Sequence, residues 1–163
     1  MKIFLIISLF CIFWLSCDQG LAPDENVPEI TGIEGTILFQ NWPPPDSLYD
    51  LRLVAFKNFP PENIFVEIIT QQAYAYPPIT VDTTWIPFYV DQAEFEFELP
   101  PGTYDYLVVA HRYGPNILED WQAVGQYDTD SDSLPSSFTI VEGQLLKNII
   151  ILADFKQLPI QPF

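Results

Sequence analysis

The chain has 163 residues, of which 22 are acidic and 6 are basic, giving a formal net charge of −16. This excess of negative charge repels phosphate backbones and anionic lipid head groups, which excludes nucleic acid as a partner and leaves cations, neutral sugars and basic protein surfaces. Apolar residues make up 48% and aromatic residues 15% of the chain. Because that content can bury a sizeable core, composition favours a folded domain over a disordered acidic chain.

Residues 1–18 have the pattern of an export signal. Lys2 precedes an apolar run from Ile3 to Leu15, and Ser16, Cys17 and Asp18 end it. One positive charge, a short apolar segment and a small residue before the break are typical of a secretory signal peptide. A membrane-spanning helix needs roughly 20 apolar residues, and this run is shorter. The segment therefore predicts export.

Cys17 marks the expected cleavage point. A cysteine directly after Ser16 resembles the signal of bacterial lipoproteins, in which the peptide is cut before the cysteine and that cysteine carries the lipid. The resemblance implies a signal peptide over residues 1–16, lipid attachment at Cys17, and a lipid-anchored protein of the bacterial cell envelope that faces the periplasm or the cell surface. Trp14 stands where such signals usually have an aliphatic residue, and plain secretion or an uncleaved anchor are the alternatives. Cys11 would leave with the signal, so the mature domain would have no disulfide.

After Cys17 the composition changes twice. Residues 17–30 lack hydrophobic periodicity and are acidic, which predicts a lipidated, extended tether. Residues 31–163 are enough for one domain and too few for two. Proline pairs or triplets at residues 43–45, 60–61, 77–78 and 100–101 separate apolar segments and would break long helices. The class is therefore predicted as all-β with stiff connections.

Short apolar segments predict the strands in chain order. We expect strands over residues 32–40, 51–57, 93–99, 104–112, 121–127, 138–141 and 146–153. Residues 60–76 predict a short helical turn that leads into a strand, and residues 80–90 predict another strand, interrupted near Pro87. Seven or eight short strands with turns between them are typical of a single β-sandwich.

The strand over residues 93–99 alternates most regularly. Glu94, Glu96 and Glu98 occupy every second position and face away from the apolar residues between them. Three glutamates on one face suggest a metal or acid–base site. We favour a solvated strand face instead, because alternating charge keeps an exposed strand soluble and resists edge pairing.

The segment from Phe95 to Tyr104 reads Phe-Glu-Phe-Glu-Leu-Pro-Pro-Gly-Thr-Tyr. It resembles the strand–Pro-Gly–strand hairpin of carboxypeptidase regulatory-like domains, the transthyretin-like (prealbumin-like) sandwich modules. Gly35-Thr36-Ile37 and Leu53-Val54-Ala55-Phe56 match two further strands of that family, and the resemblance covers residues 32–153. It implies an Ig-like or transthyretin-like sandwich that is not an enzyme and serves structure, adhesion or ligand contact. No functional residue carries over. The expected function is a structural or protein-interaction module of the envelope.

Asp128, Asp130 and Asp132 place acids at alternate positions, as calcium loops do. The full loop motif fails, because Ser133 and Thr139 stand where a glycine and a bidentate acid are expected. We favour a solvated acidic loop, with a partial calcium site as the alternative. The sequence predicts no other cofactor.

Trp42, Trp85 and Trp121 lie in or beside predicted loops. Exposed rings of this kind stack on sugars, so the alternative function is a carbohydrate-binding surface lipoprotein; buried aromatic residues are the commoner outcome. His111 is the one histidine, and no serine or cysteine has the context of a catalytic triad with it. The expected partners are the membrane, through the lipid, and an envelope protein or a glycan.

Overall fold

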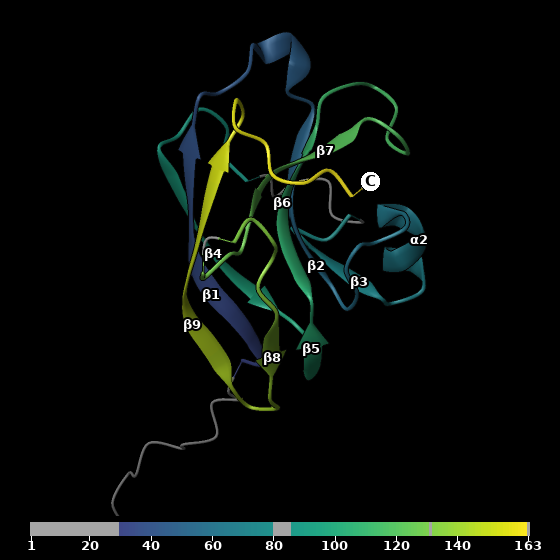
Figure 1. Cartoon of the computed structure of the whole chain (residues 1–163), viewed down its shortest axis with the longest axis vertical. Helices are drawn as coiled ribbons and strands as arrows, with labels where there is room; N and C mark the ends of the chain where they lie inside the picture. Colours follow the sequence, from purple (N-terminus) through teal and green to yellow (C-terminus); the bar gives the residue numbers. More distant parts are fainter. Residues whose placement is uncertain (1–29, 80–85, 131, 163) are drawn as a thin grey trace, which may run out of the picture.

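The computed structural model describes residues 30–79, 86–130 and 132–162. They form an all-β fold compatible with a sandwich, as predicted (Figure 1). The strands are β1 (Gly32–Gln40), β2 (Asp50–Phe56), β3 (Ala73–Tyr76), β4 (Gln92–Glu98), β5 (Gly102–Tyr104), β6 (Tyr106–Arg112), β7 (Trp121–Gln126), β8 (Phe138–Ile140) and β9 (Leu145–Asp154). The helical elements are the α-helix α2 (Ile64–Ile69) and the short 3-10 helix η2 (Pro45–Ser47).

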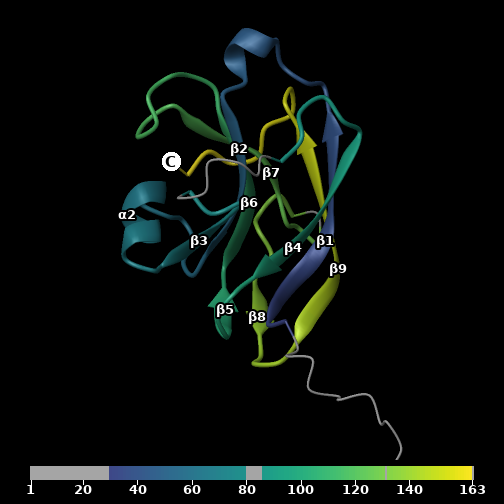
Figure 2. The ribbon, with the colours of Figure 1, turned by 180° about the vertical axis from the view of Figure 1, so that it is seen from behind.

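The seven-stranded sheet has the order β3-β2-β6-β7-β9-β1-β4, and β5 and β8 form a separate pair. Its strands fall into two layers, with β9, β1 and β4 on one side and β3, β2 and β6 on the other (Figures 1 and 2). The layers join where β7 pairs with β9 over only two residue pairs, Gly125 with Ala153 and Gln126 with Leu152. The sheet thus folds over on itself, and its two edge strands are β3 and β4.

The inter-sheet core lies between the layers. Strand alternation sends every second side chain inward from both sides. The main contributors are Ile33, Ile37, Leu51, Leu53, Phe95, Phe97, Leu107, Val109, Ile149 and Ile151. Burial of these side chains is the main favourable term in folding, at roughly 25 cal/mol per Å² of apolar surface removed from water.

A second, outer core covers the other face of β2 and β6. Its members are Val54, Phe56, Ile64, Ala73, Tyr106, Val108, Ala110, Trp121 and Ala123. Helix α2 packs here through Ile64. The short helical turn and following strand predicted for residues 60–76 are present as α2 and β3. Its N-terminus is capped by Asn63, whose side-chain oxygen accepts the N–H groups of Phe65 and Val66. Both faces of β2 are therefore buried.

Two strand predictions differ from the structure in part of their described residues. The strand expected over residues 104–112 is broken at Asp105, whose N–H donates to the carbonyl of Phe56. Because of this break Tyr104 packs in the inter-sheet core, whereas Tyr106 packs in the outer core, so the two do not share a face. In the strand expected over residues 80–90, residues 86–90 form no strand and Ile86 is buried in the inter-sheet core; residues 80–85 lie outside the described residues.

The Pro-Pro-Gly turn leads from β4 into β5 and fixes the tyrosine that follows it. Tyr104 is fully buried, and its O–H donates to the carbonyl of Pro100 at 2.9 Å. Burial raises the pKa of Tyr104 to about 12, so the phenol remains a donor at every ordinary pH. The turn expected between the last two strands is also present, with Gly143 at a φ of 72° that favours glycine.

The first described residues enter at the lower end of Figure 1, beside the start of β1 and the turn between β8 and β9. The proline-rich loop with η2 lies at the opposite end. The predicted signal peptide, Cys17 and residues 17–29 of the predicted tether fall outside the described residues. Within the described ranges, no helix has the length and apolar character needed to cross a membrane.

Candidate functional site: an acidic edge groove

The outer surface of β4 and β1 carries four glutamates, which we call the acidic edge: Glu34, Glu94, Glu96 and Glu98. On β4 they alternate with Phe95 and Phe97, which point into the inter-sheet core, as the period of the sequence predicted. On β1, Glu34 lies directly opposite Glu96 in the antiparallel register. Like charges at such a position oppose each other and destabilise the sheet. The arrangement therefore has a cost that the fold itself does not require.

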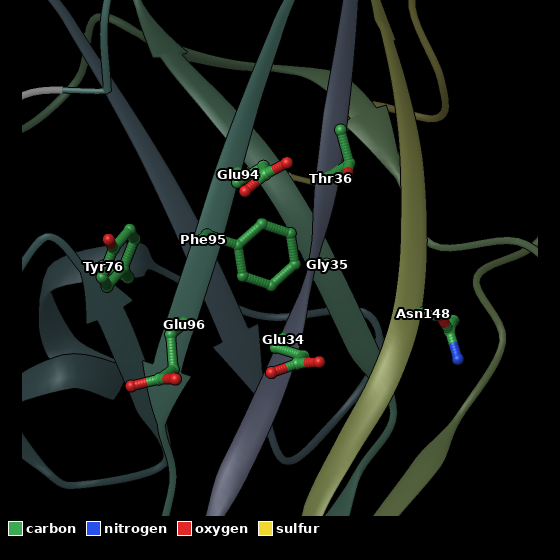
Figure 3. A pocket seen from close by; sticks show the side chains of 8 residues that line it. All are labelled: Glu34, Gly35, Thr36, Tyr76, Glu94, Phe95, Glu96 and Asn148. Atoms are coloured by element: carbon green, nitrogen blue, oxygen red, sulfur yellow. The ribbon is translucent and has the colours of Figure 1, made fainter.

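The acidic edge borders a hollow of about 460 Å³. Figure 3 shows the carboxylates of Glu34, Glu94 and Glu96 around it, with Tyr76 beyond β4 and Asn148 on β9. A β-bulge shapes this part of the sheet, because the register of β1 against β9 shifts between Ile33 and Gly35. Bulges bend a strand and re-aim its side chains.

Little positive charge balances the acidic edge. Lys147 Nζ lies 3.2 Å from Glu34 Oε1, in a pair whose lysine side chain is 60% exposed. Among the described residues, Glu94, Glu96 and Glu98 form no ion pair with a lysine or arginine. An exposed pair of this kind contributes at most about 1 kcal/mol. The edge is left strongly negative.

An apolar groove runs beside the acidic edge, between edge strands β3 and β4. It has a volume of about 590 Å³, within the range of about 300–1,000 Å³ that ligand sites occupy. The rings of Tyr76 and Phe97 meet at its floor, with centroids 5.6 Å apart. The groove is lined by Ile68, Gln71, Ala73, Tyr74, Ala75, Tyr76, Pro78, Ile79, Glu96, Phe97 and Glu98. Glu96 and Tyr76 also line the hollow, so the two form one continuous site, the edge groove.

A buried ion pair fixes the β3 side of the edge groove. Arg52 donates through Nη1 to the carbonyls of Pro77 at 2.8 Å and Pro78 at 3.3 Å, directly after β3. Its Nε lies 3.1 Å from Asp50 Oδ2, and both side chains are less than a tenth exposed. Burial raises the pKa of Asp50, and the neighbouring Arg52 opposes that rise. Sequence analysis missed this pair because a charged residue at each of two alternating positions of a strand predicts a solvated face, and here both are buried. It missed the roles of Glu34 and Tyr76 because pairing between distant strands leaves no local signal.

The acidic loop forms as a cluster. Ligand oxygens of Asp128, Asp130 and Asp132 all lie within 4.8 Å of one another, in the one such group of acids among the described residues. Each carboxylate also accepts a backbone N–H two residues on, from Asp130, Asp132 and Leu134 in turn. The carboxylates thus stabilise the loop by accepting its backbone N–H groups. Carboxylate oxygens are also the ligand atoms that calcium prefers.

The two described tryptophans of the predicted site, Trp42 and Trp121, pack against different cores. Trp42 is half-buried against the inter-sheet core, and its Nε1–H donates to the carbonyl of Val90. Trp121 is buried in the outer core, and its Nε1–H donates to the carbonyl of Ile117. Trp85 lies outside the described residues. Burial removes Trp121 from a sugar platform, and the carbohydrate-binding alternative stays a prediction that rests on Trp42 and Trp85.

His111 is buried away from the edge groove and takes a structural position. Its Nε2 lies 2.8 Å from the carbonyl of Ser47, and its Nδ1 lies 3.1 Å from Gln122 Nε2. A carbonyl can only accept, so we assign the Nε2–H tautomer, with Nδ1 accepting from Gln122. Burial lowers the pKa of His111, while the bond to Ser47 opposes that change. The ring is thus kept neutral and joins the loop before β2 to β6 and β7.

Comparison with known proteins adds no relative. No family model matches the chain, and no curated protein or solved structure is significantly similar to it.

Proposed function

We propose that this protein is a lipid-anchored, non-catalytic module of the bacterial envelope that binds another protein through the acidic edge. The observation that supports the binding role is the directly opposed pair Glu34 and Glu96, within a surface of four glutamates that, among the described residues, Lys147 alone offsets. A charge arrangement that weakens the sheet supports a surface kept for a ligand, because natural proteins break such local rules mainly at functional sites. Protein partners with basic surfaces match its charge.

The place where the described chain begins supports the same role. The chain enters the domain at Ile30, beside the start of β1 (Figure 1). The acidic edge lies on the side of the domain, along β1 and β4, and so stays open when the end is held at a membrane. We include in the proposal that the domain is a carboxypeptidase regulatory-like module, on the strength of its Pro-Pro-Gly turn and the bond from Tyr104 to Pro100.

Lipid attachment is tested by labelling the full chain, expressed in a bacterium, with a clickable fatty acid. The wild-type protein should take up label and sediment with membranes. Cys17→Ser should lose both properties, and the matched variant Cys11→Ser should keep both, because its thiol lies within the predicted signal. Equal labelling of wild type and Cys17→Ser would contradict the anchor.

Partner binding is tested with a photo-crosslinking amino acid in the same full chain. At position 96 it should yield a specific adduct with an envelope protein. At position 46, on exposed Asp46 at the far end of the domain, it should not. Absence of adducts at both positions, with the protein folded and in the envelope, would contradict an interaction role.

A further inference from the structure

We infer that the edge groove binds an extended, basic segment of a partner protein, which adds to β4 as an extra strand. The inference rests on the proposed function, because it names the partner chemistry of the same acidic edge. Three features of the described residues lead to it: an open strand edge, the charge on its outer face and the aromatic floor beneath.

The open edge is the first feature. β4 pairs with β1 on one side, and on its other side the described residues supply no strand. β3, across the groove, is likewise an edge, and within residues 30–79, 86–130 and 132–162 it pairs with β2 alone. A strand edge presents unpaired N–H and C=O groups, which an extended peptide satisfies by strand addition. The groove therefore offers backbone recognition along β4.

The negative charge of the acidic edge determines which kind of strand can be added to β4. In an added strand, side chains facing outward would stand directly beside Glu94, Glu96 and Glu98, at cross-strand distances of about 5 Å. Lysine or arginine at alternate positions would match all three. A second copy of this chain pairing through β4 would instead bring two rows of glutamates together, which like-charge repulsion disfavours. The acidic edge thus disfavours pairing of β4 with the β4 of a second copy and favours pairing with a basic strand.

The aromatic floor of the groove determines which residues suit the inward face of the added strand. Its inward side chains would meet Tyr76, Phe97 and Ile79, which line the groove. Alternating apolar residues would bury against these rings while the basic residues stay at the rim. The inferred ligand is therefore a segment in which basic and aliphatic residues alternate, such as an exposed strand or an extended tail of an envelope protein.

The test uses the full chain in a neutral detergent and a short synthetic peptide that alternates lysine and valine. Fluorescence anisotropy should show binding that weakens as salt rises. Amide exchange should show new protection confined to β4 and β3. A matched peptide alternating glutamate and valine should not bind. Absence of binding by the lysine peptide would overturn the inference.

Backbone recognition is tested with two versions of the lysine peptide, N-methylated on alternate residues so that each blocks one edge of the strand. At least one version should bind roughly tenfold more weakly, because a bidentate strand ladder is lost. If both bind like the parent peptide, the acidic edge attracts cations without strand addition, and the inference is overturned.

The protein side is tested by reversing charge. The double variant Glu94→Lys, Glu96→Lys should weaken peptide binding roughly tenfold and should remain folded, because it removes the opposition between Glu34 and Glu96. The control Asp46→Lys, compared with the single variant Glu96→Lys, makes the same charge change at the far end and should bind as the wild type does. Equal weakening of peptide binding by both variants would indicate a long-range effect of net charge and would overturn the assignment of the binding site.

Two further outcomes separate this inference from the proposed function. Protection of β4 in the absence of peptide would assign its edge to a second copy or to the chain itself, which sedimentation would distinguish, and either overturns the inference. A crosslink to an envelope protein at position 46 together with no peptide binding would overturn the inference, while an interaction role at another surface would survive.

Discussion

Tyr76 and Phe97 meet across the gap between the two edge strands of the sheet, with ring centroids 5.6 Å apart. The two residues belong to strands that share no backbone pairing. The sheet therefore closes on itself through side chains where a barrel would close through hydrogen bonds, and no strand of the described residues pairs with the outer edge of β3 or β4.

The contact between these rings should be measurable as a coupling energy. Phe97→Ala should lower the free energy of unfolding by about 3–5 kcal/mol, as for other buried phenylalanines. A double-mutant cycle with Tyr76→Ala should show a coupling of about 0.5–1.5 kcal/mol, in urea unfolding of the full chain. As a control, Phe97→Ala combined with Tyr49→Ala should give additive losses of unfolding free energy, because Tyr49 is exposed and lies directly before β2. Additivity for the Tyr76 pair would mean that the rings do not close the sheet.

Removing Arg52 should destabilise the domain and loosen the end of β3. Arg52→Met leaves Asp50 buried without its cation, at a cost of about 3–5 kcal/mol. Replacing both partners by apolar residues should cost less, because no charge is then buried alone. Urea unfolding gives the energies, and amide exchange should rise for the residues after Tyr76. A double variant that is less stable than Arg52→Met would contradict this account.

Acid should weaken the fold through His111. Burial holds its pKa below 6.5 in the folded state. As pH falls below 6.5 the unfolded chain therefore gains the proton first, and the free energy of unfolding falls by up to about 1.4 kcal/mol per pH unit. Above that pH this contribution is constant. His111→Asn should remove this part of the pH dependence while keeping a side chain able to bond to Ser47. An unchanged slope between pH 6.5 and the acid transition would exclude the histidine as its source.

Calcium should stabilise the acidic loop if the three aspartates act as ligands. At about 100 times its dissociation constant, calcium would add about 2.7 kcal/mol, which raises Tm by roughly 5–10 °C. Asp130→Asn with Asp132→Asn keeps the side-chain oxygens that accept backbone N–H groups and removes the charge, so it should abolish the shift with little other effect. Identical Tm in calcium and in chelator would leave the loop as a self-bonded acidic turn.

Local patterns predicted most of the strands. The alternation in β4 fixed which face is wet, because a strand with glutamate at every second position can bury only the other face. The same pattern could not show that Glu96 faces Glu34, or that Tyr76 reaches Phe97, since both contacts depend on which distant strands become neighbours. The interpretation of the glutamates as a solvated face described their exposure and missed the groove beside them.

The two strand errors have one physical cause. Periodicity continues through Asp105 and predicts a single strand, but the backbone there bonds to Phe56 and turns Tyr104 to the opposite core. Likewise Ile86 is apolar because it fills the inter-sheet core from a connection, not from a strand. Apolar residues in a short run report burial, and burial alone does not distinguish strand from ordered loop.

The antiparallel register of β1 with β4 has a mechanical consequence. Seven residue pairs join these strands, from Gly32 with Glu98 to Leu38 with Gln92. A force that enters at Ile30 and leaves through β4 runs along both strands, so the ladder is loaded in shear and its hydrogen bonds share the tension. The outer core lies off that route, on the other face of β2 and β6. Under the proposed function, a pull between the membrane and a bound strand would therefore pass along β1 and β4 without crossing the outer core.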